Sequence, residues 1–152
     1  MRFFQRKRNK RQLQIKEVCK GVPHSMKKAV KAAAARPVDL KGVAKYAAKA
    51  KEKDIRKAIA NIQKVSLGDS KNLILGCIRG IQGHDRSLAI SIFETYQGEL
   101  ELEGDERIIK EVVKLLNQSR RFFDAMDLIE ERGEVWALKL KNEISFRVAF
   151  SR

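Results

Sequence analysis

The chain has 152 residues, of which 43% are hydrophobic, and its formal net charge at pH 7 is +14. This length suits one domain with a modest core and is too short for two independent ones. The sequence has no apolar run of membrane-spanning length, and its two cysteines, Cys19 and Cys77, belong to no CxxC pair. We therefore expect no membrane span, no zinc site and no disulfide framework, in a protein of a reducing compartment.

The positive charge is concentrated in the first part of the chain. Residues 1–66 hold 20 Lys and Arg against 4 Asp and Glu, whereas residues 67–152 hold 13 against 15. One strongly positive end is typical of proteins that bind phosphate groups. Nucleic acid is therefore the leading expected partner, and an anionic membrane surface or an acidic protein are the lesser ones.

The first predicted segment, residues 1–23, is a basic arm or a targeting segment. It has no acid before Glu17 and no sustained apolar stripe, so we expect it to be extended or ordered only by a partner. A mitochondrial or plastid presequence has the same acid-poor composition, and both interpretations stay open. A helical-repeat domain is predicted over residues 24–133, followed by a C-terminal segment, residues 134–152.

The predicted helical domain begins with an alanine-rich helix. Ser25 can cap this helix, and Pro37 ends it because proline disfavours helical geometry at the preceding residue. A first pair of helices is predicted over residues 40–51 and 54–65. Its first member has few large apolar side chains, which makes it the weakest of three predicted pairs.

In the second predicted pair, Asp69 or Ser70 caps the first helix, and Asp85 caps the second helix after a glycine-rich turn. The glycine-rich turn runs from Gly80 to Gly83, and the three glycines Gly76, Gly80 and Gly83 would be costly in an isolated helix. We therefore expect packing against neighbouring helices to hold this one.

The third predicted pair begins at Asp105 and has the densest apolar stripe, and Ser119 caps its second helix. Phe122 and Phe123 could in principle stack on nucleobases. Their helical spacing beside Met126 instead predicts that they lie in the core.

The second helices of the three pairs share an alanine at the same point of an amphipathic pattern. These alanines, Ala58, Ala89 and Ala125, lie 31 and then 36 positions apart. An interval of this size is typical of stacked helical hairpins, which bury their apolar stripes only against one another. The predicted fold class is therefore mainly α, an α-solenoid of about three hairpins.

The pattern changes after Gly133. Apolar and polar residues alternate from Trp136 to Leu140 and again from Ile144 to Phe150, around a polar turn. A period of two predicts a β-hairpin. A capping helix is the alternative for this segment.

The helical segments SLAISIFE, residues 87–94, and FFDAMDLIEERG, residues 122–133, have an alanine, an aliphatic run and an acid. With the interval near 35 residues, they resemble the pentatricopeptide repeat family over about residues 38–133, as a short divergent member. The resemblance implies an organellar protein, mitochondrial or plastid, that binds single-stranded RNA. The positions where that family commonly has a base-reading asparagine hold Val43, Ile74 and Lys110, so we expect backbone binding and no base-reading pattern.

Enzymatic chemistry has little support in the sequence. Neither His24 nor His84 has a carboxylate or a nucleophile at a defining spacing, and the acidic runs lack the oxygen-ligand spacing of a calcium loop. No phosphate-binding loop or cofactor fingerprint occurs. We expect no catalytic residue, no metal and no cofactor.

The sequence therefore predicts an RNA-binding helical-repeat protein that grips phosphates, as a structural part of an organellar ribosome or other ribonucleoprotein. Phosphate contacts of this kind position a protein without specifying a sequence. The alternative is a protein-binding scaffold of an organellar complex, with a basic presequence. The expected RNA-binding residues are Arg6, Lys7, Arg8, Lys10, Arg11, Lys16, Lys27, Lys28, Lys31 and Arg36.

Overall fold

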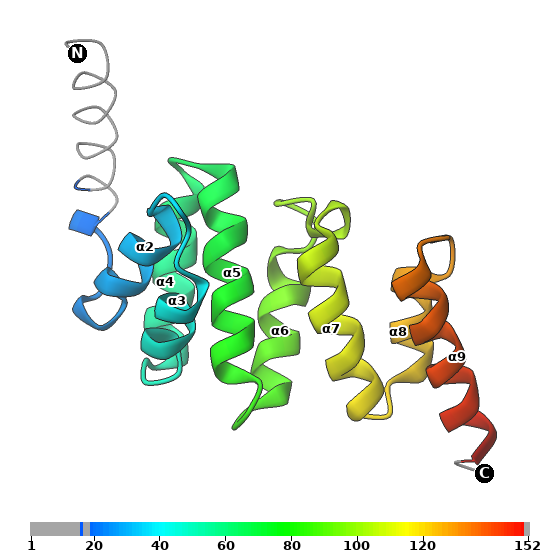
Figure 1. Cartoon of the computed structure of the whole chain (residues 1–152). Helices are drawn as coiled ribbons and strands as arrows, with labels where there is room; N and C mark the ends of the chain where they lie inside the picture. The colour runs from blue at the N-terminus through cyan, green and yellow to red at the C-terminus, as the bar shows by residue number, and fades with distance from the viewer. Residues whose placement is uncertain (1–15, 17–18, 151–152) are drawn as a thin grey trace. The chain divides into compact units, whose positions relative to one another are not determined.

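The computed structural model describes Lys16 and residues 19–150, and these residues form helices and turns with no strand among them (Figure 1). The mainly α prediction is confirmed. The bounds of the helices are η1 (His24–Met26), α2 (Lys27–Ala34), α3 (Leu40–Ala47), α4 (Glu52–Gln63), α5 (Leu67–Ile81), α6 (Arg86–Tyr96), η2 (Leu102–Gly104), α7 (Glu106–Gln118), α8 (Phe122–Ile129) and α9 (Val135–Phe150).

The chain divides into two compact units, Met1–Ile81 and Gln82–Arg152, which we call the N-terminal and the C-terminal unit. The boundary lies within the segment that the sequence predicts as one repeat domain, residues 24–133. It also falls inside the second predicted pair, because α5 belongs to the N-terminal unit and α6 to the C-terminal unit.

Local signals set the helix ends of the N-terminal unit. The Asp39 carboxylate caps α3 by accepting a hydrogen bond of 2.9 Å from the Gly42 amide. Helix α5 begins at Leu67, and the Ser66 hydroxyl accepts a hydrogen bond of 3.2 Å from the amide of Asp69. The prediction that Asp69 or Ser70 caps this helix is therefore wrong, because both lie inside it. Helix α2 ends before Pro37 as predicted. Ser25, predicted as its cap, instead donates a hydrogen bond of 2.9 Å to the carboxylate of Asp54.

Helix α5 is the centre of the N-terminal unit, because α2, α3 and α4 all pack against it (Figure 1). Its side chains from Leu73 to Leu75 are fully buried, and so is Cys77. Burial raises the pKa of the Cys77 thiol to about 12, which keeps it protonated and unreactive. Helix α3 packs mainly on α5 and α2 rather than on α4, its predicted pair partner.

Two of the three glycines predicted to need tertiary packing, Gly76 and Gly80, lie where α3 crosses α5 most closely, whereas Gly83 lies in the turn after α5 with no close neighbour. A Cβ atom at Gly76 would lie 2.3 Å from Cγ1 of Val43, and one at Gly80 would lie 2.3 Å from the carbonyl oxygen of Ala44. Only a residue without a side chain fits at these two positions. The helix-propensity cost of the glycines is therefore offset by the close approach of the two helices.

In the C-terminal unit, α6 packs on α7, α7 on α8, and α9 on both α7 and α8. Asp85 caps α6 and Asp105 caps α7, as predicted. Ala58, Ala89 and Ala125 lie in α4, α6 and α8, and all three are fully buried. The shared alanine therefore does mark a buried position in each of these helices.

The start of α8 differs from its prediction. Ser119 ends α7, and α8 begins after Arg121 without a side-chain cap. Phe122 is only half-buried and Phe123 is 85% exposed, so the prediction that both lie in the core is wrong. Helix α8 is short. It buries Ala125 and Ile129, whereas the side chains of its first turn are not buried.

The predicted C-terminal β-hairpin is wrong, because residues 135–150 form the single helix α9, which was the alternative. Ala137, Leu140 and Ile144 are buried at helical spacing. Other apolar residues lie outside this buried face, among them the exposed Leu138 and Phe146. Along the sequence, the buried and the exposed apolar residues together give the alternating apolar and polar pattern that is typical of a strand.

In the part of the chain that the structure describes, no helix has both the length and the apolar character needed to cross a membrane.

Candidate nucleic-acid interface

A group of lysines lies on the adjacent helices α2 and α3 of the N-terminal unit. Lys28 and Lys45 flank the ring of Tyr46, with their ammonium nitrogens 5.5 and 5.7 Å from the ring centroid. Tyr46 thus joins a lysine of one helix to a lysine of the next through two cation–π contacts. We call this group the lysine cluster; its members are Lys27, Lys28, Lys31, Lys41 and Lys45.

The lysine cluster is electrostatically uncompensated. Neither α2 nor α3 contains an acidic residue, and no cluster lysine has an ion pair with any described residue. Like charges one helical turn apart, as in Lys27 with Lys31 and Lys41 with Lys45, destabilise a helix by roughly 0.2–0.5 kcal/mol per pair. A polyanion bound across both helices would remove this repulsion.

The described acids of the N-terminal unit offset only a small part of its positive charge. Residues 19–81 contain fifteen Lys and Arg and only four acids. These acids and their partners are Asp39 with the Gly42 amide, Glu52 with Arg56, Asp54 with Ser25, and Asp69 with Arg36. Residues 19–81 therefore carry an excess of eleven positive charges.

The predicted RNA-binding residues fall into three groups. The five in the arm lie outside the described residues: Arg6, Lys7, Arg8, Lys10 and Arg11. Lys16, Lys28 and Lys31 are exposed and Lys27 is half-buried. Arg36 has a structural contact, since its guanidinium lies 2.8 Å from the buried carboxylate of Asp69 and also donates to the carbonyl oxygen of Ala35.

Sequence reasoning missed Lys41, Lys45 and Tyr46. Lys41 and Lys45 lie one turn apart in a helix without acids, which was a signal available in the sequence. The pairing of Tyr46 with Lys28 was not available, because it depends on the packing of α3 against α2.

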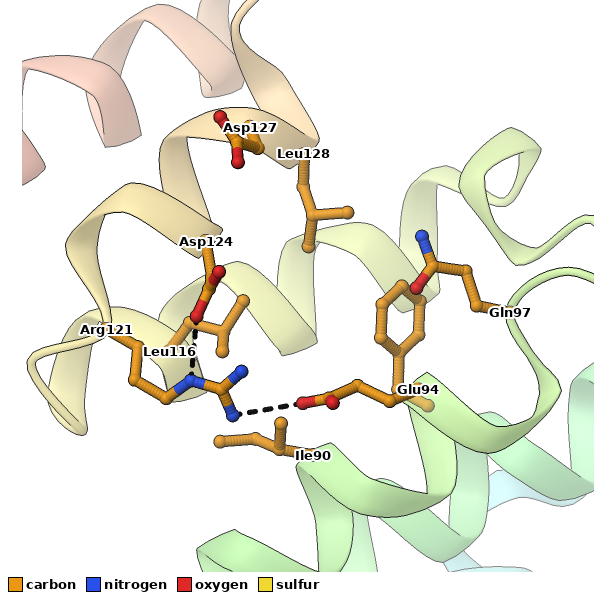
Figure 2. Close-up of a pocket in the computed structure, with 9 residues that line it drawn as sticks. Ile90, Glu94, Gln97, Leu116, Arg121, Asp124, Asp127 and Leu128 are labelled. Carbon is orange, nitrogen blue, oxygen red and sulfur yellow. Dashed lines mark hydrogen bonds and ion pairs between the residues drawn. The ribbon is translucent and has the colours of Figure 1, made fainter.

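The C-terminal unit has a groove of opposite character between α6 and α8, with a volume of about 240 Å³ (Figure 2). Its walls are apolar, as at Ile90, and its rim carries Glu94, Asp124 and Asp127. Arg121 crosses the groove and bonds to Glu94 at 3.0 Å and to Asp124 at 2.9 Å (Figure 2). The hydrogen bond to Asp124, and then that to Glu94, raise the pKa of the Arg121 guanidinium.

This groove repels a polyanion, because its lining holds three carboxylates and one guanidinium. Arg121 also ties α6 to α8, although its side chain is 42% exposed, so the link is worth at most about 1 kcal/mol. Of the two sites, only the lysine cluster has the charge to bind nucleic acid.

Among the described residues, no group of His, Cys, Asp and Glu is arranged to hold a metal ion.

No family model matches the chain, and no curated protein or solved structure matches it either. The proposed function therefore rests on the site. The fold and the site define a mainly α protein whose N-terminal unit has uncompensated lysines near a tyrosine.

Proposed function

We propose that the protein binds RNA through the phosphate backbone and that the lysine cluster is the main described contact surface. The observation that supports this most strongly is that α2 and α3 are rich in lysine and contain no acid, in a unit where residues 19–81 hold fifteen Lys and Arg against four acids. Lysines of this kind neutralise phosphates and release counterions. The ring of Tyr46 makes cation–π contacts with two of these ammonium groups.

The polymer that fits this surface best is single-stranded RNA. The shared buried alanines of α4, α6 and α8 support a pentatricopeptide-like helical-repeat architecture, and that resemblance implies single strands rather than duplex. We propose that the chain works as a structural component of an organellar ribosome or another ribonucleoprotein. The basic arm, residues 1–23, would then extend the positive surface along the RNA.

The test is a titration of the full chain against labelled single-stranded RNA of mixed sequence, followed by fluorescence anisotropy at several salt concentrations. For single strands, log K falls by about 0.7 per phosphate neutralised for each tenfold rise in salt. About six contacts would lower the affinity roughly 300-fold between 50 and 200 mM salt. An affinity that does not change with salt would reject the proposal.

A second candidate function is a protein-binding scaffold, which the acidic groove of Figure 2 favours. An apolar groove with an acidic rim suits a basic peptide with an apolar anchor. In this reading residues 1–36 are a presequence, whose cleavage would lower the net charge from +14 to about +3 because they hold twelve Lys and Arg and one acid. Such cleavage would also remove Ala29 and Ala33 of α2, which are fully buried in the N-terminal unit.

Intact-mass measurement on native protein separates the two candidates. A mature chain that retains α2 keeps the lysine cluster and supports RNA binding. A mature chain that begins near residue 37 favours the scaffold.

A further inference from the structure

We infer that the C-terminal unit holds one nucleobase of the bound RNA in an aromatic pocket where the end of α9 meets the start of α8. This inference rests on the proposed function, since RNA must bind before a base can reach the pocket. The pocket has a volume of about 280 Å³ and lies on an otherwise acidic unit. It is lined by Gln118, Arg120, Phe122, Phe146, Arg147 and Phe150.

The aromatic rings of this pocket are open to solvent. Phe146 is 64% exposed and Phe150 is 76% exposed, and their ring centroids lie 4.5 Å apart with planes inclined by 36°. Phe122 lines the same pocket from the first turn of α8. Exposed aromatic side chains are the stacking platforms of proteins that bind single strands, because every base has a π face.

The charge around the pocket favours an anionic ligand. Arg120 and Arg147 are exposed and have no ion pair within the described chain. The C-terminal unit has more acids than bases, and three of its other arginines, Arg107, Arg121 and Arg132, are paired with carboxylates. No acid lines the pocket.

Two free guanidiniums beside exposed phenyl rings match a nucleotide, whose phosphate and base they can bind together. An apolar helix face would contact the rings alone, whereas a nucleotide offers a stacking face to the rings and an anion to the arginines. The observations therefore favour RNA over self-association.

The backbone at Arg120 supports a role for its side chain. Arg120 follows the C-cap residue Ser119 of α7 and has a φ of 61°, in the left-handed region, and the Arg121 amide donates to the Leu116 carbonyl oxygen at 2.8 Å. Glycine is the usual residue at this position of a helix C-terminus. An arginine here is strained, but it contributes a cationic side chain to the pocket lining.

The test compares Phe146→Ala with wild type in the full chain, using single-stranded RNA and an abasic oligonucleotide of the same length. Loss of one stacked base lowers affinity about 5- to 150-fold. We expect this loss on RNA, no loss on the abasic strand, and an unchanged slope of log K against log salt, since no charge is removed. Arg147→Gln should instead reduce that slope by about 0.7.

Phe123→Ala is the matched control, because Phe123 is an exposed phenylalanine of the same unit that does not line the pocket. The inference is overturned if Phe146→Ala binds RNA as tightly as Phe123→Ala does. It is also overturned if Phe146→Ala changes only the sedimentation of the protein, which would make the rings a contact between copies. In both cases a steep salt slope would leave the proposed function standing, whereas a wild-type chain that binds no RNA rejects both.

Discussion

Replacement of Gly80 by valine is expected to destabilise the N-terminal unit by about 3 kcal/mol. A Cβ at this position would lie 2.3 Å from the carbonyl oxygen of Ala44, which is backbone and cannot rotate away. Helices α3 and α5 would have to separate, and the tight packing of Val43 against Gly76 would be lost with them. Chemical denaturation followed by far-UV circular dichroism measures the loss.

Gly83→Val is the matched control for this change. Gly83 lies in the turn after α5, it has a negative φ, and a Cβ there would have no neighbour within 4 Å. We expect its free energy of unfolding to remain within about 0.5 kcal/mol of wild type. Equal stability of the two variants would mean that α3 does not approach α5 at Gly80.

Replacement of all five cluster lysines by glutamine is expected to lower the RNA affinity more than either Phe146→Ala or Arg147→Gln does. Five phosphate contacts contribute about 3.5 to the slope of log K against log salt, which corresponds to a loss on the order of 3,000-fold at 0.1 M salt. The lysines are exposed or half-buried and make no ion pair with a described residue, so the fold should be retained. Anisotropy titrations at several salt concentrations give both the affinity and the slope.

A control with the same change in net charge is available in the same unit. It replaces five lysines outside the cluster by glutamine: Lys51, Lys53, Lys57, Lys64 and Lys71. Helix α4, which holds two of them, contains the acids Glu52 and Asp54, so its field is weaker than that of α2 and α3. If both variants lose the same affinity, RNA binding depends on the total positive charge of the unit, and the cluster is not a distinct contact surface.

Local signals predicted several helix boundaries correctly, although the predicted caps Ser25 and Ser119 were wrong. Asp85 was predicted as a cap and Asp105 as the start of the third pair, and both accept amide hydrogen bonds in the structure. Pro37 ended a helix for the steric reason that the sequence supplies. These features depend on neighbours within one turn, so they are visible without a fold.

The failures involve residues whose environment is set by other helices. The apolar residues of α9 were read as a strand, because a sequence does not show which of two apolar faces is buried; here Leu140 is buried and Phe146 is exposed. Phe123 was predicted as core for the same reason. The candidate site was predicted in part. The charge pattern of the sequence predicted Lys28, whereas the contact of its ammonium group with the ring of Tyr46 depends on how the helices pack.

The central claim is that RNA lies on the lysine cluster, and lysine-reactivity footprinting by mass spectrometry tests it most directly. The full chain is acylated with and without single-stranded RNA, and the modification of each lysine is quantified. The account predicts that RNA protects Lys28, Lys31 and Lys45, while Lys114 and Lys139 of the C-terminal unit, both exposed, react as before. Unchanged reactivity of the cluster lysines under saturating RNA would contradict it.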